Sequence, residues 1–258
     1  MSVPDQLRLC VIGNSHVLPL RANWSSVAEL EGVATTFFCA SGRKLDGLKV
    51  EGSAIVPDNP ALAEALKQTA RVTDRIVPAD YDAALVVGLQ TGIRPLWDLY
   101  ATHRLAEHAR PRHVVISPAC LEMAIEGMFA RSVAVRIFAL LRELGMNRIY
   151  LVPDPNTPEQ YAVNRPTLAD AAVNAFVSAA FDRGLAQLSA RHGVTVIHQR
   201  PETKRDGFTL AHYSMSTDDE EEGRRTSRVR MLHASKAFGL LVAQDVAAAL
   251  RKKARTAA

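Results

Sequence analysis

The sequence predicts an α/β fold: a single doubly wound domain with a mainly parallel sheet of five or six strands and helices on both faces. Short apolar, β-branched segments alternate with longer segments of helical apolar spacing almost throughout the 258 residues. The short segments are apolar at consecutive positions, which is typical of parallel strands that are buried on both faces. No fixed repeat and no Pro/Gly-rich linker divides the chain, so we expect one flavodoxin-like three-layer domain over residues 1–258.

The predicted elements follow from these two periodicities. Most of the predicted strands end at or near a glycine or a proline; they cover residues 7–12, 33–39, 83–87, 113–116, 148–152 and 194–197. Helical apolar spacing covers residues 60–72, 93–109, 121–144, 167–192 and 234–253. Residues 199–230 are polar and carry an acidic run followed by two arginines, and we expect them to form a long loop excursion before the last helix.

Composition narrows the functional classes. The chain is 48% hydrophobic, 22% charged and 6% aromatic, which is ordinary for a globular protein. Its 31 basic and 27 acidic side chains give a net charge of only +4, so we expect no nucleic-acid partner. The start of the chain lacks the pattern of a secretory signal, and no apolar run reaches the roughly 18 residues that a membrane span requires. We therefore expect a cytoplasmic protein without a membrane span; the sequence leaves its oligomeric state open.

The cysteines and the lack of cofactor motifs argue against disulfides, metal sites and nucleotide cofactors. Cys10, Cys39 and Cys120 are an odd number without a CxxC pair, which argues against a disulfide framework and a structural zinc site. Cys10 and Cys39 lie in predicted strands and are expected to be buried apolar residues. His103 and His108 are five residues apart, which misses the spacing of two metal ligands on one helical face. Dinucleotide and P-loop motifs are missing from the sequence, so no metal and no cofactor are expected.

Candidate chemistry lies just after the strands, because the carboxyl ends of parallel strands face the binding crevice. The first strand is followed by Gly13-Asn14-Ser15-His16. A serine at this turn could attack an acyl carbon while nearby backbone N–H groups stabilise the oxyanion. The alternative is structural, since Asn and Ser are also preferred caps of a following helix.

Two further residues could complete such a site. His233 lies at the start of the last predicted helix, where the helix dipole favours a neutral imidazole that can accept a proton. Gln90 follows Gly88 at the end of the third strand, and its amide could donate to a developing oxyanion. Taken alone, His233 could be a capping or solvated histidine at a helix terminus, and Gln90 a loop glutamine.

The order of these short blocks resembles the SGNH, or GDSL-like, hydrolase superfamily. Gly13-Asn14-Ser15, Gly42, Gly88-Leu89-Gln90 and His233 occur in the order of that family's blocks across nearly the whole chain. The resemblance implies Ser15 as the nucleophile, His233 as the general base, and the Ser15 N–H, Gly42 and Gln90 as oxyanion-hole donors. It also implies a small-molecule acyl ester, an acetylated saccharide or a thioester as the acyl donor, used by a hydrolase or an O-acyltransferase.

Three positions depart from the family pattern. Asn14 replaces an aspartate, and Gln90 replaces an asparagine. Arg230 stands three residues before His233, where the family has the acid of the triad, and a cation there opposes an imidazolium. Asp218, Asp219 or Glu220 could instead support His233 if the 199–230 excursion acts as a lid, or a backbone carbonyl could do so. The alternative for the acidic run is a solvated surface patch in a disordered insertion. The alternative function is a catalytically lapsed module that binds an anionic or saccharide ligand, in which Arg230, Asn14 and His16 would be ligand contacts.

Overall fold

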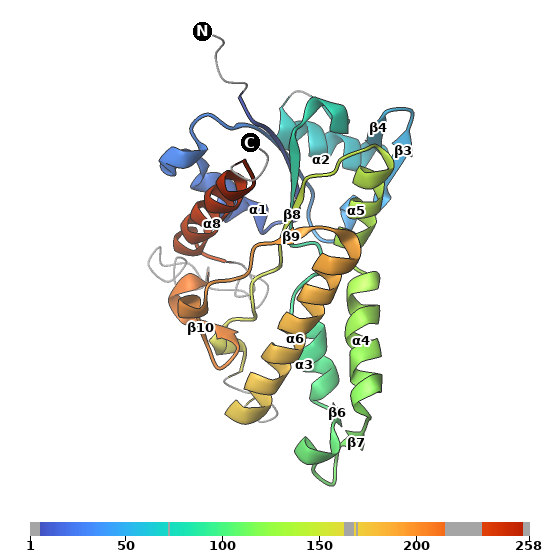
Figure 1. The fold of residues 1–258 in the computed structure, drawn as a ribbon, viewed down its shortest axis with the longest axis vertical. Coiled ribbons are helices and arrows are strands. Elements are labelled where there is room, and N and C mark those ends of the chain that lie inside the picture. Colours follow the sequence, from blue (N-terminus) through green and yellow to red (C-terminus); the bar gives the residue numbers. More distant parts are fainter. Residues whose placement is uncertain (1–5, 72, 163–167, 169, 215–233, 255–258) are drawn as a thin grey trace.

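The central sheet has five parallel strands in the order β2-β1-β5-β8-β9 (Figure 1). The computed structural model describes residues 6–71, 73–162, 168, 170–214 and 234–254. The strands are β1 (Arg8–Gly13), β2 (Ala34–Cys39), β5 (Ala83–Val87), β8 (Ile149–Val152) and β9 (Thr195–Val196). This order is the flavodoxin-like winding, so the predicted fold class is confirmed. Its switch point lies between β1 and β5, where the chain changes direction across the sheet.

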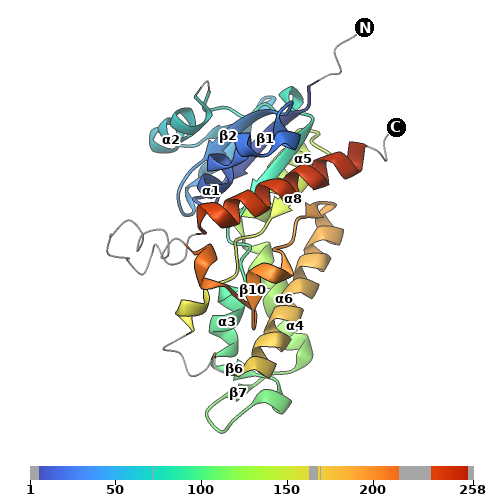
Figure 2. The same cartoon turned by 90° about the vertical axis from the view of Figure 1, so that its left-hand side faces the viewer.

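Helices cover both faces of the sheet. One face carries α1 (Val17–Ala22) and α8 (Lys236–Ala254), which lie together in front of the strands in Figure 2. The residues of this face form the first hydrophobic core. On the other face, a second core includes residues of α2 (Pro60–Ala70), α3 (Arg94–Tyr100), α4 (Pro118–Ala130), α5 (Val133–Glu143) and α6 (Ala171–His192). Along β1, Leu9 and Val11 enter the first core and Cys10 and Ile12 the second, all without exposed surface. This double burial explains the continuous apolar strands.

The predicted strand at residues 113–116 is not part of the central sheet. β5 is hydrogen-bonded directly to β8, which leaves no place between them. Residues Val114–Val115 form β7 instead, paired with β6 (His103–Arg104) in a separate two-stranded sheet, and both valines are more than half exposed. An apolar run alone does not distinguish a central strand from an edge strand.

Other expected elements are shorter or divided. The long helix predicted over residues 121–144 is broken into α4 and α5, because the side chain of Ser132 accepts a hydrogen bond from Val135 N–H and starts a new helix. The helix predicted over residues 93–109 ends at Tyr100. Two small antiparallel pairs complete the described strands: β3 (Leu48–Glu51) with β4 (Ala54–Pro57), and β10 (Lys204–Arg205) with β11 (Phe208–Thr209).

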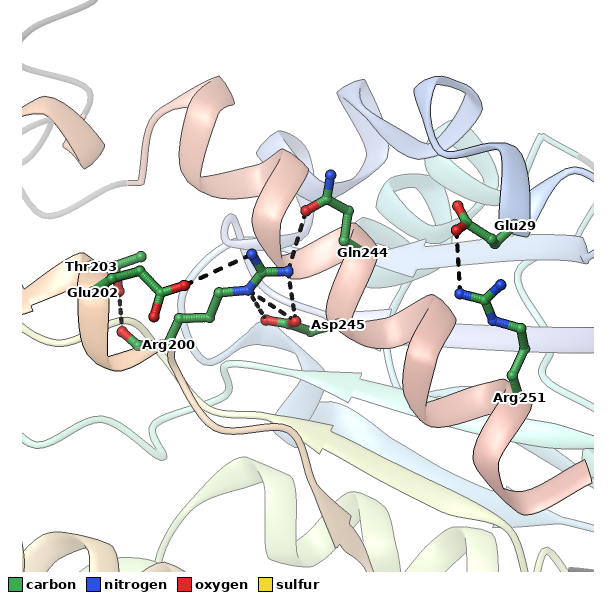
Figure 3. A network of polar contacts seen from close by, with 7 residues as sticks. All are labelled: Glu29, Arg200, Glu202, Thr203, Gln244, Asp245 and Arg251. Carbon is green, nitrogen blue, oxygen red and sulfur yellow. Dashed lines mark hydrogen bonds and ion pairs between the residues drawn. The ribbon is translucent and has the colours of Figure 1, made fainter. Parts of the chain in front are cut away.

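Polar contacts join α8 to segments beside the sheet (Figure 3). The guanidinium of Arg200 contacts both carboxylate oxygens of Asp245, with Nε–O distances of 3.0 and 2.9 Å, and Arg251 reaches Glu29 further along the helix. Near the other end, a Cβ on Gly239 would overlap the backbone carbonyl of Pro19 in α1. α8 therefore lies directly against the short helix that follows Ser15. No helix in the described part of the chain is both long and apolar enough to cross a bilayer.

The first half of the predicted polar excursion is anchored to the body of the protein. Residues 199–214 contain β10, β11 and short 3-10 turns rather than an extended loop. Phe208 is buried and stacks on Trp97 with ring centroids 5.2 Å apart, and the Gln199 amide donates to Thr203 and Thr209. Residues 215–230, which carry the charged runs, lie outside the described residues.

Candidate active site

Ser15 lies in the turn between β1 and α1, at the carboxyl end of the sheet. Gly13 is required there because a Cβ would lie 2.5 Å from the Val17 side chain and 2.6 Å from the Val87 carbonyl. Asn14 stabilises the turn itself, since its Oδ1 accepts a hydrogen bond from His16 N–H at 3.0 Å, while α1 begins after His16 without a side-chain cap. The turn thus holds a half-buried serine between two side chains that are themselves fixed.

The loop after β5 has an unusual backbone. Gly88, Leu89 and Gln90 all have positive φ, at 71°, 60° and 68°, and two of these three are not glycine. Such residues cost free energy, and they persist only where the surroundings hold them. Leu89 is fully buried, and its carbonyl accepts from Ala134 N–H, while Thr91 Oγ1 donates to the Gly88 carbonyl at 2.8 Å. These contacts fix the backbone that carries Gln90.

Asp154 connects the strand ends and was not identified from the sequence. It follows β8, and its Oδ2 accepts from Thr91 N–H at 2.8 Å. Its Oδ1 lies 3.2 Å from Asn14 Nδ2 and 3.3 Å from His16 Nε2. A Cβ on Gly88 would lie 2.5 Å from the same Oδ1, so the carboxylate fills the space that this glycine leaves. Its place two residues after an apolar strand is a weak signal, because a lone acidic residue after a proline matches no motif.

Arg43 joins the loop after β2 to the loop after β5. Its Nη1 donates to Gln90 Oε1 at 2.6 Å, and its Nη2 contacts Asp46 at 3.0 Å. Because the amide oxygen of Gln90 faces Arg43, the amide nitrogen points the other way and remains a donor. Gly42, the residue before Arg43, has a φ of 63°. β2, β1 and β5 are adjacent and parallel, so Gly42, Ser15 and Gln90 follow the carboxyl ends of three neighbouring strands.

A cavity of about 440 Å³ opens at this edge. Its walls come from loops after β1, β2, β5 and β8 and from the ends of α3, α4 and α5. The lining residues are His16, Arg43, Gln90, Gly92, Arg94, Pro95, Met128, Arg131, Ser132, Asp154, Pro155, Thr157 and Pro158. Ser15 and Gly42 are not among the lining residues, but each is next in sequence to one, Ser15 to His16 and Gly42 to Arg43. The cavity is large enough for a small organic ligand.

Several predicted site residues lie outside the described residues: Asp218, Asp219, Glu220, Arg230 and His233. The chain resumes at Ala234, which pairs with Ser214 in a β-bridge, and Ser235 N–H donates to the Tyr213 carbonyl at 2.8 Å. Lys236 then begins α8, and its carbonyl accepts from the Asn23 amide at the end of α1. The residues that follow His233 therefore pair with residues 213–214 and lead within two residues into α8, the helix that packs against α1.

The buried cysteines are structural, as expected. Cys10 and Cys39 are buried in β1 and β2, and burial raises the pKa of both thiols, that of Cys39 to about 12. Neither forms a thiolate near neutral pH. Cys120, at the start of α4, is exposed.

Comparisons with known proteins find similarity to solved structures but no match in sequence. No family model and no curated protein matches the chain. Among solved structures, the lipase Lip_vut3 from a goat rumen metagenome is 14% identical with a TM-score of 0.44, over 94% of this chain and 97% of that one. A catalytic mutant of Axe2, an acetylxylan esterase from Geobacillus stearothermophilus, is 12% identical with a TM-score of 0.36, over 95% and 94%. The class of this protein, a parallel three-layer α/β fold with a polar site at the switch point, is defined by its own sheet order and strand directions.

Proposed function

We propose that the protein is a serine-dependent acyl-ester hydrolase or O-acyltransferase in which Ser15 is the nucleophile and His233 the general base. One observation carries the proposal: Ser15, Gly42 and Gln90 follow three adjacent parallel strands at the switch point. Ligands of open α/β sheets bind at this place. The left-handed backbone at Gln90 and its contact with Arg43 support a donor held in one orientation.

In the proposed reaction, Ser15 Oγ attacks the acyl carbon as its proton passes to His233. The Ser15 and Gly42 N–H groups and the Gln90 amide donate to the oxyanion that forms. The C–O bond to the alcohol breaks as His233 returns the proton to the leaving oxygen. Water or a second hydroxyl then attacks the acyl-enzyme in the same way and releases Ser15. The substrate is a small-molecule acyl ester; an acetylated saccharide and a thioester remain candidate donors.

Asp154 is proposed as a positioning residue of this site. Its contacts with Asn14 and His16 involve the two residues that flank Ser15 in sequence, and its contact with Thr91 involves the loop of Gln90. One carboxylate thereby joins the loop of the nucleophile to the loop of the oxyanion donor.

Labelling with a fluorophosphonate probe tests the proposal. The wild-type protein should be labelled and should hydrolyse at least one ester from a panel of acetyl and longer acyl esters. Ser15→Ala should abolish both, and His233→Ala should lower both by several orders of magnitude. Ser53→Ala is the matched control, because Ser53 is exposed in the turn between β3 and β4. Labelling that persists in Ser15→Ala contradicts the proposal. Ligand-dependent thermal stabilisation without labelling supports the binding module instead.

The partner of His233 requires separate variants. If the 199–230 excursion acts as a lid that supplies a carboxylate, one of Asp218→Asn, Asp219→Asn and Glu220→Gln should sharply lower the rate without affecting folding. The other two should leave the rate unchanged. If all three are active, and a partial deletion of the excursion is also active, the lid hypothesis is wrong.

A further inference from the structure

Three arginines from separate elements line the cavity of the candidate site. Arg43 follows β2, Arg94 begins α3, and Arg131 ends α4. The lining contains one carboxylate, Asp154, whose oxygens already accept from Thr91 N–H and the Asn14 amide. The cavity therefore has an excess of positive charge.

The three guanidinium groups differ in their own partners. Arg43 is held by Gln90 and by Asp46. Arg94 lies 3.8 Å from Asp98 in a contact between two half-exposed side chains, which compensates little of its charge. For Arg131 the described residues provide no carboxylate partner. Arg131 is consequently the most available cation of the cavity.

The local backbone adds to the same field. A Cβ on Gly127 would lie 3.2 Å from Arg131 Nη1, so the missing side chain gives this guanidinium room along the last turn of α4. Ser132, also in the lining, caps the eleven-residue helix α5, so the positive end of the α5 dipole faces the same region. Met128 and Pro95 provide apolar wall between the charged groups.

We propose that the ester substrate of this site is anionic, and that Arg94 and Arg131 bind a carboxylate, phosphate or sulfate on it. The inference takes the ester bond of the substrate from the proposed function. The anion site itself does not depend on that function. A neutral substrate would leave Arg131 without a described carboxylate partner and Arg94 with only its half-exposed contact to Asp98, whereas an oxyanion accepts charge-assisted hydrogen bonds from both. The anion can lie on the acyl or on the alcohol part, and the two cases are separable by experiment.

Two pairs of esters test the proposal, each with a charged member and its neutral methyl ester. Mono-4-nitrophenyl adipate and methyl 4-nitrophenyl adipate carry the group on the acyl side, and 4-acetoxybenzoate and methyl 4-acetoxybenzoate on the alcohol side. In at least one pair, kcat/KM should favour the charged member by tenfold or more. The preference should shrink as ionic strength rises. Turnover without preference for the charged member in either pair overturns the proposal and leaves the ester function intact.

Variants assign the preference to the named residues. Arg94→Gln/Arg131→Gln should lower the charged-to-neutral ratio of kcat/KM by at least tenfold, mainly through a raised KM for the charged ester. Arg183→Gln is the matched control, because Arg183 is an exposed arginine on α6 outside the cavity. If the charged-to-neutral ratio of kcat/KM is the same in the double variant and in the wild type, other residues cause the preference and the proposal is overturned.

A binding measurement separates this proposal from the catalytic one. Calorimetry with Ser15→Ala protein should show binding of 4-acetamidobenzoate and at least tenfold weaker binding of neutral 4-acetamidobenzamide. The Arg94→Gln/Arg131→Gln changes should remove this difference. If the wild type cleaves no ester but this pattern holds, the anion site stands and the catalytic function fails. If neither charged ester nor charged analogue is favoured, the anion site is wrong.

Discussion

His16 Nε2 lies 3.3 Å from Asp154 Oδ1, which joins the turn after β1 to the loop after β8. The same carboxylate reaches Thr91 in the loop after β5, the strand that lies between β1 and β8. A single side chain thereby connects the carboxyl ends of three adjacent strands. This connection sets the shape of the candidate site and leads to the first two predictions.

Asp154→Ala should lower the free energy of unfolding by about 1–3 kcal/mol, because Thr91 N–H and the Asn14 amide lose a partly buried acceptor. Asp154→Asn should cost less, since its carbonyl can still accept from Thr91. Urea unfolding measures both, with Asp182→Ala on the exposed side of α6 as control. Equal stabilities of Asp154→Ala and the control would show that Asp154 does not hold the loops together.

Gly88→Ala should destabilise the protein more than Gly145→Ala. Both glycines have positive φ, 71° and 84°, so both changes carry a backbone cost of about 1–2 kcal/mol. Only at Gly88 does the added Cβ also meet Asp154 and Asn14, whereas nothing lies within 4 Å at Gly145. The overlap should add about 1–3 kcal/mol. Thermal or urea unfolding of the two variants compares them directly, and equal losses would contradict the packing described here.

Gln90→Ala should lower kcat by about 100-fold or more with little change in KM, if its amide stabilises the oxyanion. Gln90→Asn keeps an amide and tolerates the left-handed backbone, and should retain more activity. Arg43→Ala should have an intermediate effect, because it frees the amide without removing it. Steady-state kinetics on a neutral ester measures all three. A Gln90→Ala variant with unaltered kcat excludes Gln90 from the oxyanion hole.

One thiol of three should react with a disulfide reagent in the native protein at pH 8. Cys10 and Cys39 are buried, and burial raises the pKa of both thiols, so neither supplies a thiolate. Cys120 is exposed and should react. Denaturation should make all three reactive, and Cys120→Ser should remove the native signal. Rapid reaction of two or more thiols in the native state would contradict the burial of the strand cysteines.

Some site features were visible in the sequence and others were not. The sequence predicts Ser15, Gly42 and Gln90 as site residues because each follows an apolar strand in a block with glycine, and the structure places all three after adjacent parallel strands. Asp154 also follows a strand, but a lone acidic residue after a proline has no pattern that marks it. The sequence does not distinguish the three arginines of the cavity from the other arginines, which occur throughout the chain.

The sequence by itself determined the fold class, because strands buried on both faces require continuous apolar residues and helices on each side. It also determined the positions of all five central strands to within a few residues. Only the tertiary structure shows that residues 113–116 lie outside the central sheet. β5 pairs directly with β8, and this contact joins residues far apart in the sequence. The convergence of Asp154, His16 and three arginines on one cavity is likewise set by loop conformation. Loop conformation depends on contacts with residues far away in the chain, such as that of Asp154 with Thr91. These contacts cannot be predicted from the residues next to Asp154 in sequence.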